Sequence, residues 1–280
     1  MLVVRETSWE NHMESQSFDG LVELYDESRC FDRACFETAL DYIVERFPPG
    51  EFPSVFEPGV GTGRIAIPFA ERGYRVTGGD ISDEMMAVLQ ARLADRPFDI
   101  ALRKADATDL PFSDGSFDLA VAVHLFYHIK DWRKAADELL RAVRPGGALL
   151  LMHTGMGMEV PFLNDRYKQL CAEHGCESEM VGVRSTSEVI AYLKERGFDV
   201  EEVDRGWDWT TSIELAQALG YLRWRAYSFT VFATNKVHGM VMDQLEAEVI
   251  DRFGDLSTEV DVPNRIGLVI VHRKWSVCST

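Results

Sequence analysis

The stretch Glu57-Pro-Gly-Val-Gly-Thr-Gly-Arg64 decides the fold, because its glycines alternate with other residues between a short apolar run and a helical pattern. Glycine permits backbone angles that other residues avoid, and it removes side chains that would block the close approach of a ligand. The helix beyond presents free backbone N–H groups in its first turn. Such a loop, placed after a strand, is typical of a cofactor-binding α/β protein.

On both sides of this loop, apolar strand-like runs alternate with amphipathic helical patterns. The expected strands cover residues 54–56, 75–80, 99–103, 117–123, 148–152, 198–203 and 266–271. Strands that alternate with helices form an open sheet with helices on both faces. Right-handed crossovers then bring the C-terminal strand ends to one edge, where ligands bind. The sequence therefore predicts an α/β fold with a doubly wound, seven-stranded, mostly parallel sheet.

The remaining segments are expected to cover the ligand edge. Residues 1–49 are predicted to form an N-terminal helical lid, and residues 50–280 a single domain with lid or substrate insertions at about 155–184 and 206–264. The segment from Trp207 to Phe232 is rich in aromatic residues. That composition predicts either a lid core or a pocket for an aromatic or lipophilic substrate.

Composition excludes several classes of protein. The 280 residues carry a net charge of −17 and are 46% hydrophobic, which suits a globular chain and argues against nucleic acid or an anionic membrane as partner. No apolar run approaches the roughly 18 residues of a membrane span.

Five cysteines, an odd number, favour a reducing compartment, so we expect a cytoplasmic protein. Cys171, His174 and Cys176 lie close together, but no second ligand pair follows, and we expect no metal site.

Two alternatives for the glycine loop can be weighed from its spacing. A dinucleotide loop needs G-x-G-x-x-G, and here Arg64 stands where the last glycine belongs. A P-loop is excluded because no Gly-Lys-Ser/Thr follows. Asp80, at the end of the second strand, can accept hydrogen bonds from both hydroxyls of a ribose.

Four segments together carry a resemblance to a known family. They are Glu57-Pro-Gly-Val-Gly-Thr-Gly63, Val76-Thr-Gly-Gly-Asp-Ile-Ser82, Ala105-Asp-Ala-Thr-Asp-Leu-Pro-Phe112 with Ser116-Phe-Asp118, and Leu140-Arg-Ala-Val-Arg-Pro-Gly-Gly147. The chain resembles a class I S-adenosylmethionine-dependent methyltransferase of the small-molecule type, similar to ubiquinone and menaquinone C-methyltransferases. The resemblance covers about half of the chain and implies a Rossmann-like sheet whose last strand is antiparallel. One departure is Gly79, which stands where the family has a branched apolar residue.

The resemblance also implies which residues bind S-adenosylmethionine. Three glycines would lie against its methionine part, Glu57 would order the loop, and Asp80 would bind the ribose. Ile81 and Met85 would flank the adenine, with Asp106 and the backbone of Ala107 on its polar edge. The implied cofactor-binding residues are Tyr25, Glu57, Gly59, Gly61, Gly63, Asp80, Ile81, Met85, Asp106, Ala107 and His124.

Candidates for a general base lie after the fourth and fifth strands. His124 and His153 are the two catalytic candidates, because both come at the expected ligand edge. His128 belongs to a Tyr-His-Ile segment that family members use to begin the next helix, which favours a structural role.

The expected function is therefore methyl transfer from S-adenosylmethionine to a small-molecule acceptor, aromatic or lipophilic, by in-line displacement. Three alternatives stay open: a non-catalytic S-adenosylmethionine-binding regulatory module, another transferase that uses a modified S-adenosylmethionine, and a nicotinamide-dependent oxidoreductase. The expected partner is the small-molecule substrate, without nucleic acid or a membrane span, and a homodimer stays open.

Overall fold

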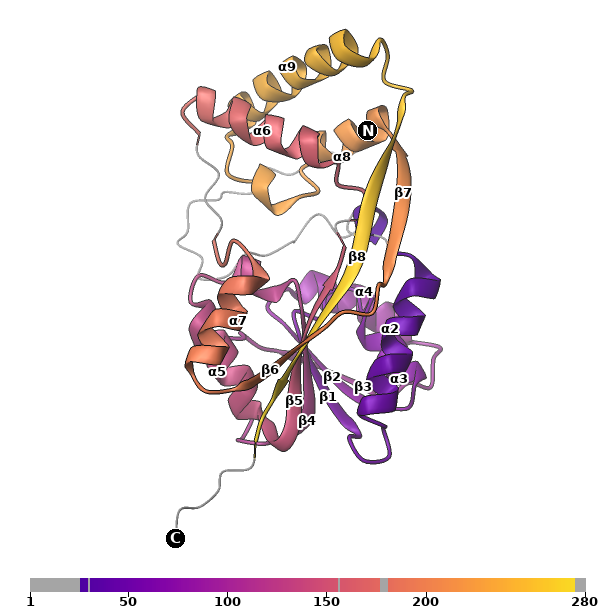
Figure 1. Cartoon of the computed structure of the whole chain (residues 1–280), viewed down its shortest axis with the longest axis vertical. Coiled ribbons are helices and arrows are strands. Elements are labelled where there is room, and N and C mark those ends of the chain that lie inside the picture. Colours follow the sequence, from indigo (N-terminus) through magenta and orange to yellow (C-terminus); the bar gives the residue numbers. More distant parts are fainter. Residues whose placement is uncertain (1–25, 30, 156, 177–180, 275–280) are drawn as a thin grey trace.

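A computed structural model describes residues 26–29, 31–155, 157–176 and 181–274 of the chain. Its centre is a sheet in the strand order β3-β2-β1-β4-β5-β8-β6 (Figure 1). These strands are β1 (Ser54–Pro58), β2 (Arg75–Asp80), β3 (Ile100–Lys104), β4 (Phe117–Val123), β5 (Val143–Thr154), β6 (Asp199–Val203) and β8 (Glu259–His272). The five strands β1 to β5 pair in parallel, whereas β8 runs antiparallel between β5 and β6. The predicted mostly parallel sheet with an antiparallel last strand is confirmed.

The two faces of the sheet bury alternate residues of the same strands. Val121 and Leu150 belong to the core on one face, and Ala120 and Leu149 to the core on the other. This alternation follows from the two-residue period of a strand. One face carries α2 (Arg33–Arg46), α3 (Ala66–Glu71) and α4 (Asp83–Leu93), and the other carries α5 (Trp132–Ala142) and α7 (Thr186–Glu195).

Several helices begin where local chemistry predicts. Ser82 Oγ accepts a hydrogen bond from the backbone N–H of Met85 and so caps α4 at its N-terminus. Asp131 does the same for α5, and Ser185 forms a capping box with Glu188 at the start of α7. These short-range interactions set the directions in which the helices leave the sheet edge.

The predicted N-terminal helical lid over residues 1–49 is described only from residue 26 onward, except for residue 30. The described helix is α2, which starts after the cap residue Asp32. Its apolar side places Phe36, Leu40 and Ile43 in the core of the sheet. Tyr25, one of the residues that the resemblance assigns to the cofactor, lies outside the described residues.

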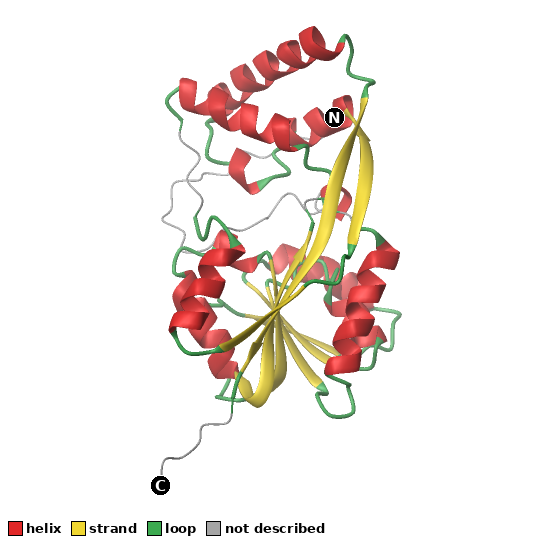
Figure 2. Cartoon of the chain, viewed as in Figure 1, coloured by secondary structure: helices red, strands yellow, loops and turns green. Residues whose placement is uncertain are grey.

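A helical cap lies above the C-terminal edge of the parallel strands (Figure 2). It consists of α6 (Pro161–Glu173), α8 (Leu215–Arg223), the short η2 (Ser228–Thr230) and α9 (Asn235–Phe253). These helices bury a core of their own that includes Tyr167, Leu219 and Met242. Among the described residues, no helix is both long and apolar enough to cross a membrane.

An eighth strand, β7 (Asp208–Glu214), corrects the predicted count of seven. It lies within the insertion predicted at about 206–264 and pairs with the first half of β8, from Glu259 to Arg265. The last strand, β8, is therefore longer than the strand predicted at 266–271. Its first half alternates buried and exposed residues in a two-stranded ribbon with β7, so it has no continuous apolar run. This ribbon runs from the sheet to the cap and connects the two layers (Figure 1).

The predicted aromatic segment is divided between the two layers. Trp207 is buried in the core of the sheet, whereas Tyr221, Tyr227 and Phe229 are buried in the cap. Trp224 is 56% exposed. The segment therefore forms core in both layers and does not form one continuous pocket wall.

Candidate functional site

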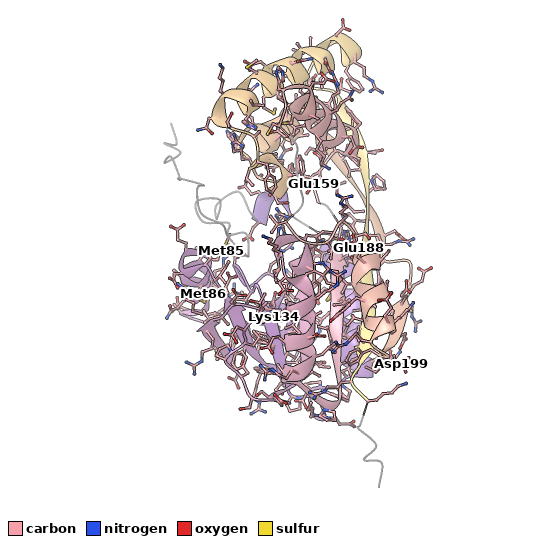
Figure 3. The ribbon with its side chains drawn as sticks, turned by 90° about the vertical axis from the view of Figure 1, so that its left-hand side faces the viewer. Met85, Met86, Lys134, Glu159, Glu188 and Asp199 are labelled. Atoms are coloured by element: carbon pink, nitrogen blue, oxygen red, sulfur yellow. The ribbon has the colours of Figure 1, made fainter. Side chains whose placement is uncertain are left out.

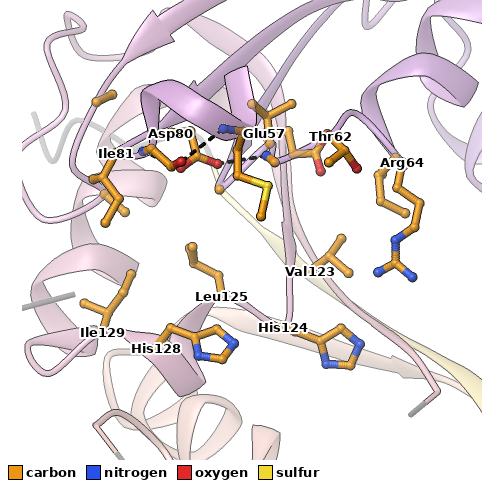
Figure 4. Close-up of a pocket in the computed structure, with 18 of the residues that line it drawn as sticks. Glu57, Thr62, Arg64, Asp80, Ile81, Val123, His124, Leu125, His128 and Ile129 are labelled. Atoms are coloured by element: carbon orange, nitrogen blue, oxygen red, sulfur yellow. Dashed lines mark hydrogen bonds between the residues drawn. The ribbon is translucent and has the colours of Figure 1, made fainter. Parts of the chain in front are cut away.

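A cavity opens at the C-terminal ends of β1, β2 and β4, where the doubly wound topology predicts a ligand (Figure 4). One wall is the glycine loop after β1, and a second is the end of β2 with the start of α4. The third wall is the segment from Val123 to Ile129, and Arg29 from the N-terminal segment completes the lining.

The glycine loop adopts backbone angles that explain its composition. Gly59, Gly61 and Gly63 have φ values of +66°, +53° and +83°, in the region that favours glycine. Gly59 and Gly61 line the cavity. At Gly61 the nearest atom to an added Cβ would be 3.9 Å away, so the loop presents bare backbone to the cavity there.

Gly63 is not among the residues that line this cavity, and its predicted contact with the cofactor stays a prediction. A Cβ at this position would lie 2.2 Å from Cδ1 of Leu89, a fully buried residue of α4. The third glycine therefore lets α4 pack closely against the loop. The same reasoning explains the departure at Gly79, where a Cβ would lie 3.0 Å from the Phe56 ring.

Asp80 connects the end of β2 to the glycine loop. Its Oδ2 accepts a hydrogen bond from the Gly61 N–H at 2.8 Å, and its Oδ1 accepts one from the Ser82 N–H at 2.9 Å (Figure 4). The side chain lines the cavity, and the residue is 8% exposed. Each carboxylate oxygen can accept a second bond, so Asp80 can hold the loop and bind two hydroxyls together.

Glu57, near the end of β1 and directly before the glycine loop, has a buried carboxyl group. The residue is 4% exposed, and its Oε2 has no hydrogen-bond partner among the described residues. Burial raises the pKa of Glu57 well above its ordinary value, Arg64 opposes this rise, and Asp80 adds to it. Leaving a buried acceptor unsatisfied is unfavourable by about 1–3 kcal/mol, so the site fits a ligand that supplies a donor or a positive charge.

Three of the four residues that the resemblance assigns to the adenine line the cavity, and their contact with adenine stays a prediction. Ile81, Met85 and Ala107 line the cavity. Asp106 does not line it, and its Oδ1 accepts hydrogen bonds from the Thr108 N–H and hydroxyl at 2.8 and 2.9 Å. These hydrogen bonds form the turn after β3 that positions the Ala107 backbone. Asp106 therefore acts on the cavity through the position of Ala107.

His124 lines the cavity in a conformation that is rare for a residue other than glycine. Its φ is +50°, and its Nε2 accepts a hydrogen bond from the Thr154 N–H at 3.2 Å. A neutral ring that accepts at Nε2 carries its proton on Nδ1. Burial, with neighbouring histidines and arginines, lowers the pKa of His124 well below its ordinary value. His124 is thus a neutral group whose basic nitrogen is already occupied.

His153, the other catalytic candidate, is not among the residues that line the cavity. Its ring centroid lies 4.5 Å from that of His124, and its Nδ1 accepts a hydrogen bond from the Gly155 N–H at 3.2 Å. Burial lowers the pKa of His153. The two rings meet at an interplanar angle of 62°.

Two further residues line the cavity: His128, for which the sequence favoured a structural role, and Arg29, which the sequence did not indicate. His128 lines the cavity near Ile129, and burial together with Arg29 lowers its pKa to about 3 (Figure 4). Arg29 also lines the cavity, and its Nη2 donates a hydrogen bond to the Ala226 carbonyl of the cap at 3.3 Å. Arg64 donates to the Arg29 carbonyl, so the glycine loop holds this segment in place. In the sequence, Arg29 lies four residues after Tyr25, which the resemblance assigns to the cofactor.

Comparison with known proteins agrees with this geometry. Residues 56–151 match the family described as "Methyltransferase domain". A demethylmenaquinone methyltransferase of Thermus thermophilus is 33% identical over 116 residues, which are 41% of this chain and 51% of that protein. The chain thus spans about half the length of this curated relative.

Solved structures share the fold at low sequence identity. The YcgJ protein of Bacillus subtilis has a TM-score of 0.57 at 19% identity, over 85% of this chain and all of the other. The [4+2]-cyclase SpnF has a TM-score of 0.53 at 16% identity, over 89% of this chain and 85% of the other. The fold alone therefore does not determine the reaction. Residues 56–151 are thus similar to a methyltransferase domain, and most of the residues that line the cavity belong to this matched segment.

Proposed function

We propose that this chain binds S-adenosylmethionine in the cavity at the strand ends and transfers its methyl group to a small-molecule acceptor. The observation that carries the proposal is the buried Glu57 Oε2, which lacks a partner among the described residues and lies beside the glycine loop of the matched segment. The ammonium group of the cofactor supplies the donors and the positive charge that this oxygen lacks.

The residues around Glu57 would bind the rest of the cofactor. Asp80 would accept hydrogen bonds from the ribose hydroxyls, while its bonds to Gly61 and Ser82 keep the carboxylate in place. Ile81 and Met85 would pack on the adenine faces. These contacts divide the cavity into a charged end and an apolar end.

When bound, the cofactor supplies an electrophilic methyl group on a positively charged sulfur, and the protein supplies alignment and a dry site. His124 and His128 have lowered pKa values and so stay neutral near pH 7. Neutral rings add no positive charge beside a cationic ligand. They also present apolar surface and fixed dipoles to it.

The acceptor is proposed to be aromatic or lipophilic and to enter between the cavity and the cap. Support comes from the cap segment at Ala226, which contacts Arg29 of the cavity and continues into the buried Tyr227 and Phe229. The matched Thermus protein is named a demethylmenaquinone methyltransferase, which points in the same direction. The odd cysteine count favours a reducing compartment, and we place the activity in the cytoplasm.

The cofactor assignment is tested by calorimetry with S-adenosylmethionine, S-adenosylhomocysteine and NADH in parallel. Binding of the first two but not of NADH is expected, and tight binding of NADH alone would refute the proposal. Transfer is tested by incubating the protein with methyl-labelled S-adenosylmethionine and the small-molecule fraction of a cell extract. Binding of the cofactor without label transfer to any metabolite would favour the non-catalytic regulatory module.

A further inference from the structure

Two cysteines that do not line the cavity lie at the C-terminal end of α6 and just after it. The sequence singled out Cys171, His174 and Cys176 as a cluster without a second pair of metal ligands. Among the described residues, no group of three or more His, Cys, Asp or Glu side chains could hold a metal ion. The chain enters the cap at Glu159, and α6 follows and ends at Glu173 (Figure 3). The two cysteines therefore belong to the cap.

The chain leaves α6 through a turn of the Schellman type. The Gly175 N–H donates a hydrogen bond to the Ala172 carbonyl, and the Cys176 N–H donates one to the Cys171 carbonyl, both at 2.9 Å. Gly175 has a φ of +73°, the left-handed conformation that this turn places at that position. Side chains at the two residues of the outer hydrogen bond, here Cys171 and Cys176, frequently contact each other in such a turn. The turn is therefore a backbone frame that brings two cysteines together.

Backbone geometry limits how far apart the two cysteines can lie. Because the Cys176 nitrogen is 2.9 Å from the Cys171 carbonyl oxygen, standard bond lengths keep the two Cα atoms within about 6.8 Å of each other. Cα atoms joined by a disulfide usually lie about 4.4–6.8 Å apart. Both cysteines also pack in the apolar core of the cap, Cys171 within it and Cys176 against it. The pair thus lies within the reach of a disulfide.

The two thiols differ in exposure and in partners. Cys176 is partly exposed, and its Sγ donates a hydrogen bond to the Phe232 carbonyl at 3.3 Å. Cys171 is 2% exposed and shares a side-chain hydrogen bond with Tyr167. Burial raises the pKa of Cys171, while the bond to Tyr167 and the charge of Arg225 oppose this rise. Cys176 is therefore the thiol that a reagent reaches first, and Cys171 lies behind it.

We propose that Cys171 and Cys176 are a reversible redox site, which forms a disulfide by exchange with oxidised glutathione. The Cys176 thiolate attacks one glutathione sulfur, and the electron pair of the glutathione S–S bond leaves with the first glutathione. Cys171 then loses its proton and attacks the Cys176 sulfur, and the second glutathione leaves as a thiolate. The two protons of the cysteines end on the two glutathione molecules, and the two electrons that the cysteines lose reduce the glutathione disulfide.

The disulfide would remove two contacts inside the cap. The Cys176 sulfur would have no proton to donate to the Phe232 carbonyl, and the Cys171 sulfur would turn away from Tyr167. Phe232 lies between η2 and α9, and the Tyr167 hydroxyl is hydrogen-bonded to Nδ1 of His238 on α9 at 2.6 Å. The oxidised protein should therefore be looser where α6 meets α9.

The first test traps the thiols of the full chain after equilibration with mixtures of reduced and oxidised glutathione. Both cysteines lie in the tryptic peptide 169–184, which is expected to be lighter by two hydrogen atoms in the oxidised protein. Dithiothreitol should return it completely to the dithiol. A lasting glutathione adduct on Cys176, a disulfide from Cys176 to Cys30 or Cys278, or no reaction at all would overturn the proposal.

Single serine variants test the order of the two steps. Cys171→Ser should stop at the mixed disulfide between glutathione and Cys176, whereas Cys176→Ser should leave Cys171 unmodified in the folded protein. Cys35→Ser, at a partly exposed thiol of α2, is the matched control and should not change the formation of the disulfide. Reaction of Cys171 in Cys176→Ser as fast as that of Cys176 in the wild type would contradict the assigned order.

Hydrogen exchange followed by mass spectrometry tests the effect on the cap. Loss of one hydrogen bond corresponds to exchange that is faster by about threefold or more, and we expect this increase over residues 227–240 of the oxidised protein. The amides of β4, in the sheet, are the internal control and should exchange equally in both states. Equal exchange over residues 227–240 would show that the disulfide does not loosen the cap. None of these measurements needs a cofactor, so their failure would leave the proposed methyl transfer standing.

Discussion

Replacement of Gly63 by alanine tests whether the third glycine of the loop serves packing or cofactor contact. The resemblance to the family assigned it to the cofactor, whereas the structure places it against Leu89 of α4. Gly61→Ala is the matched comparison, because Gly61 lines the cavity and has open space at its Cβ position. The two substitutions add the same methyl group two residues apart.

The expected loss of stability in Gly63→Ala has two parts. A φ of +83° is strained for alanine by about 1–2 kcal/mol. The new Cβ would lie 2.2 Å from Leu89 Cδ1, and Leu89 is fully buried, so α4 or the loop must shift. Such overpacking destabilises by about 1–3 kcal/mol, which gives a total of about 2–5 kcal/mol. Gly61→Ala should lose only the first part, about 1–2 kcal/mol.

The free energy of unfolding is measured by urea titration, and affinity by calorimetry with S-adenosylhomocysteine. Gly63→Ala should lower the free energy of unfolding clearly more than Gly61→Ala, and Gly61→Ala should lose more affinity. In the double variant Gly63→Ala with Leu89→Ala, the overpacking part should disappear, which appears as coupling between the two sites. A stable Gly63→Ala protein that no longer binds S-adenosylhomocysteine would refute this assignment and restore Gly63 to the cofactor site.

Three further predictions concern single charged or titratable side chains. Asp80→Asn should weaken S-adenosylhomocysteine binding more than tenfold in calorimetry, through loss of charge-assisted hydrogen bonds, and unchanged affinity would contradict the ribose assignment. Glu57 has a raised pKa, so its burial destabilises the fold increasingly as pH rises. The free energy of unfolding of Glu57→Gln should therefore exceed that of the wild type by more at pH 9 than at pH 6, and the variant should bind the cofactor more weakly. Parallel curves of unfolding free energy against pH for the two proteins would exclude this account. His238 is hydrogen-bonded to the Tyr167 hydroxyl in the cap, and its pKa is lowered to about 4. The neutral His238 ring therefore stabilises the fold fully above about pH 6.5, and this stabilisation is lost as the pH falls toward 4. His238→Gln should reduce the slope of unfolding free energy against pH in that window by about 1.4 kcal/mol per pH unit, and an unchanged slope would show that His238 is not the titrating group.

The sequence alone determined the class of fold and the centre of the site, because both depend on short-range chemistry. The alternation of apolar strands with capped helices predicted the sheet, and the caps at Ser82 and Asp131 are interactions within one helical turn. The glycines at 59 and 61 and the carboxylate of Asp80 lie within one β-α-β unit, so their spacing was enough to predict that they meet.

Only the tertiary structure decided which neighbouring residues face the cavity and which face another element. Gly63 follows Gly61 by two residues but packs against Leu89 of α4, and the His153 ring lies 4.5 Å from that of His124 without lining the cavity. The pairing of β7 with β8 joins residues 45 to 57 positions apart, and the hydrogen bond from Arg29 to the Ala226 carbonyl joins residues 197 positions apart. A local sequence pattern does not predict such contacts. It indicates which residues are buried, whereas long-range packing determines which element each buried side chain contacts.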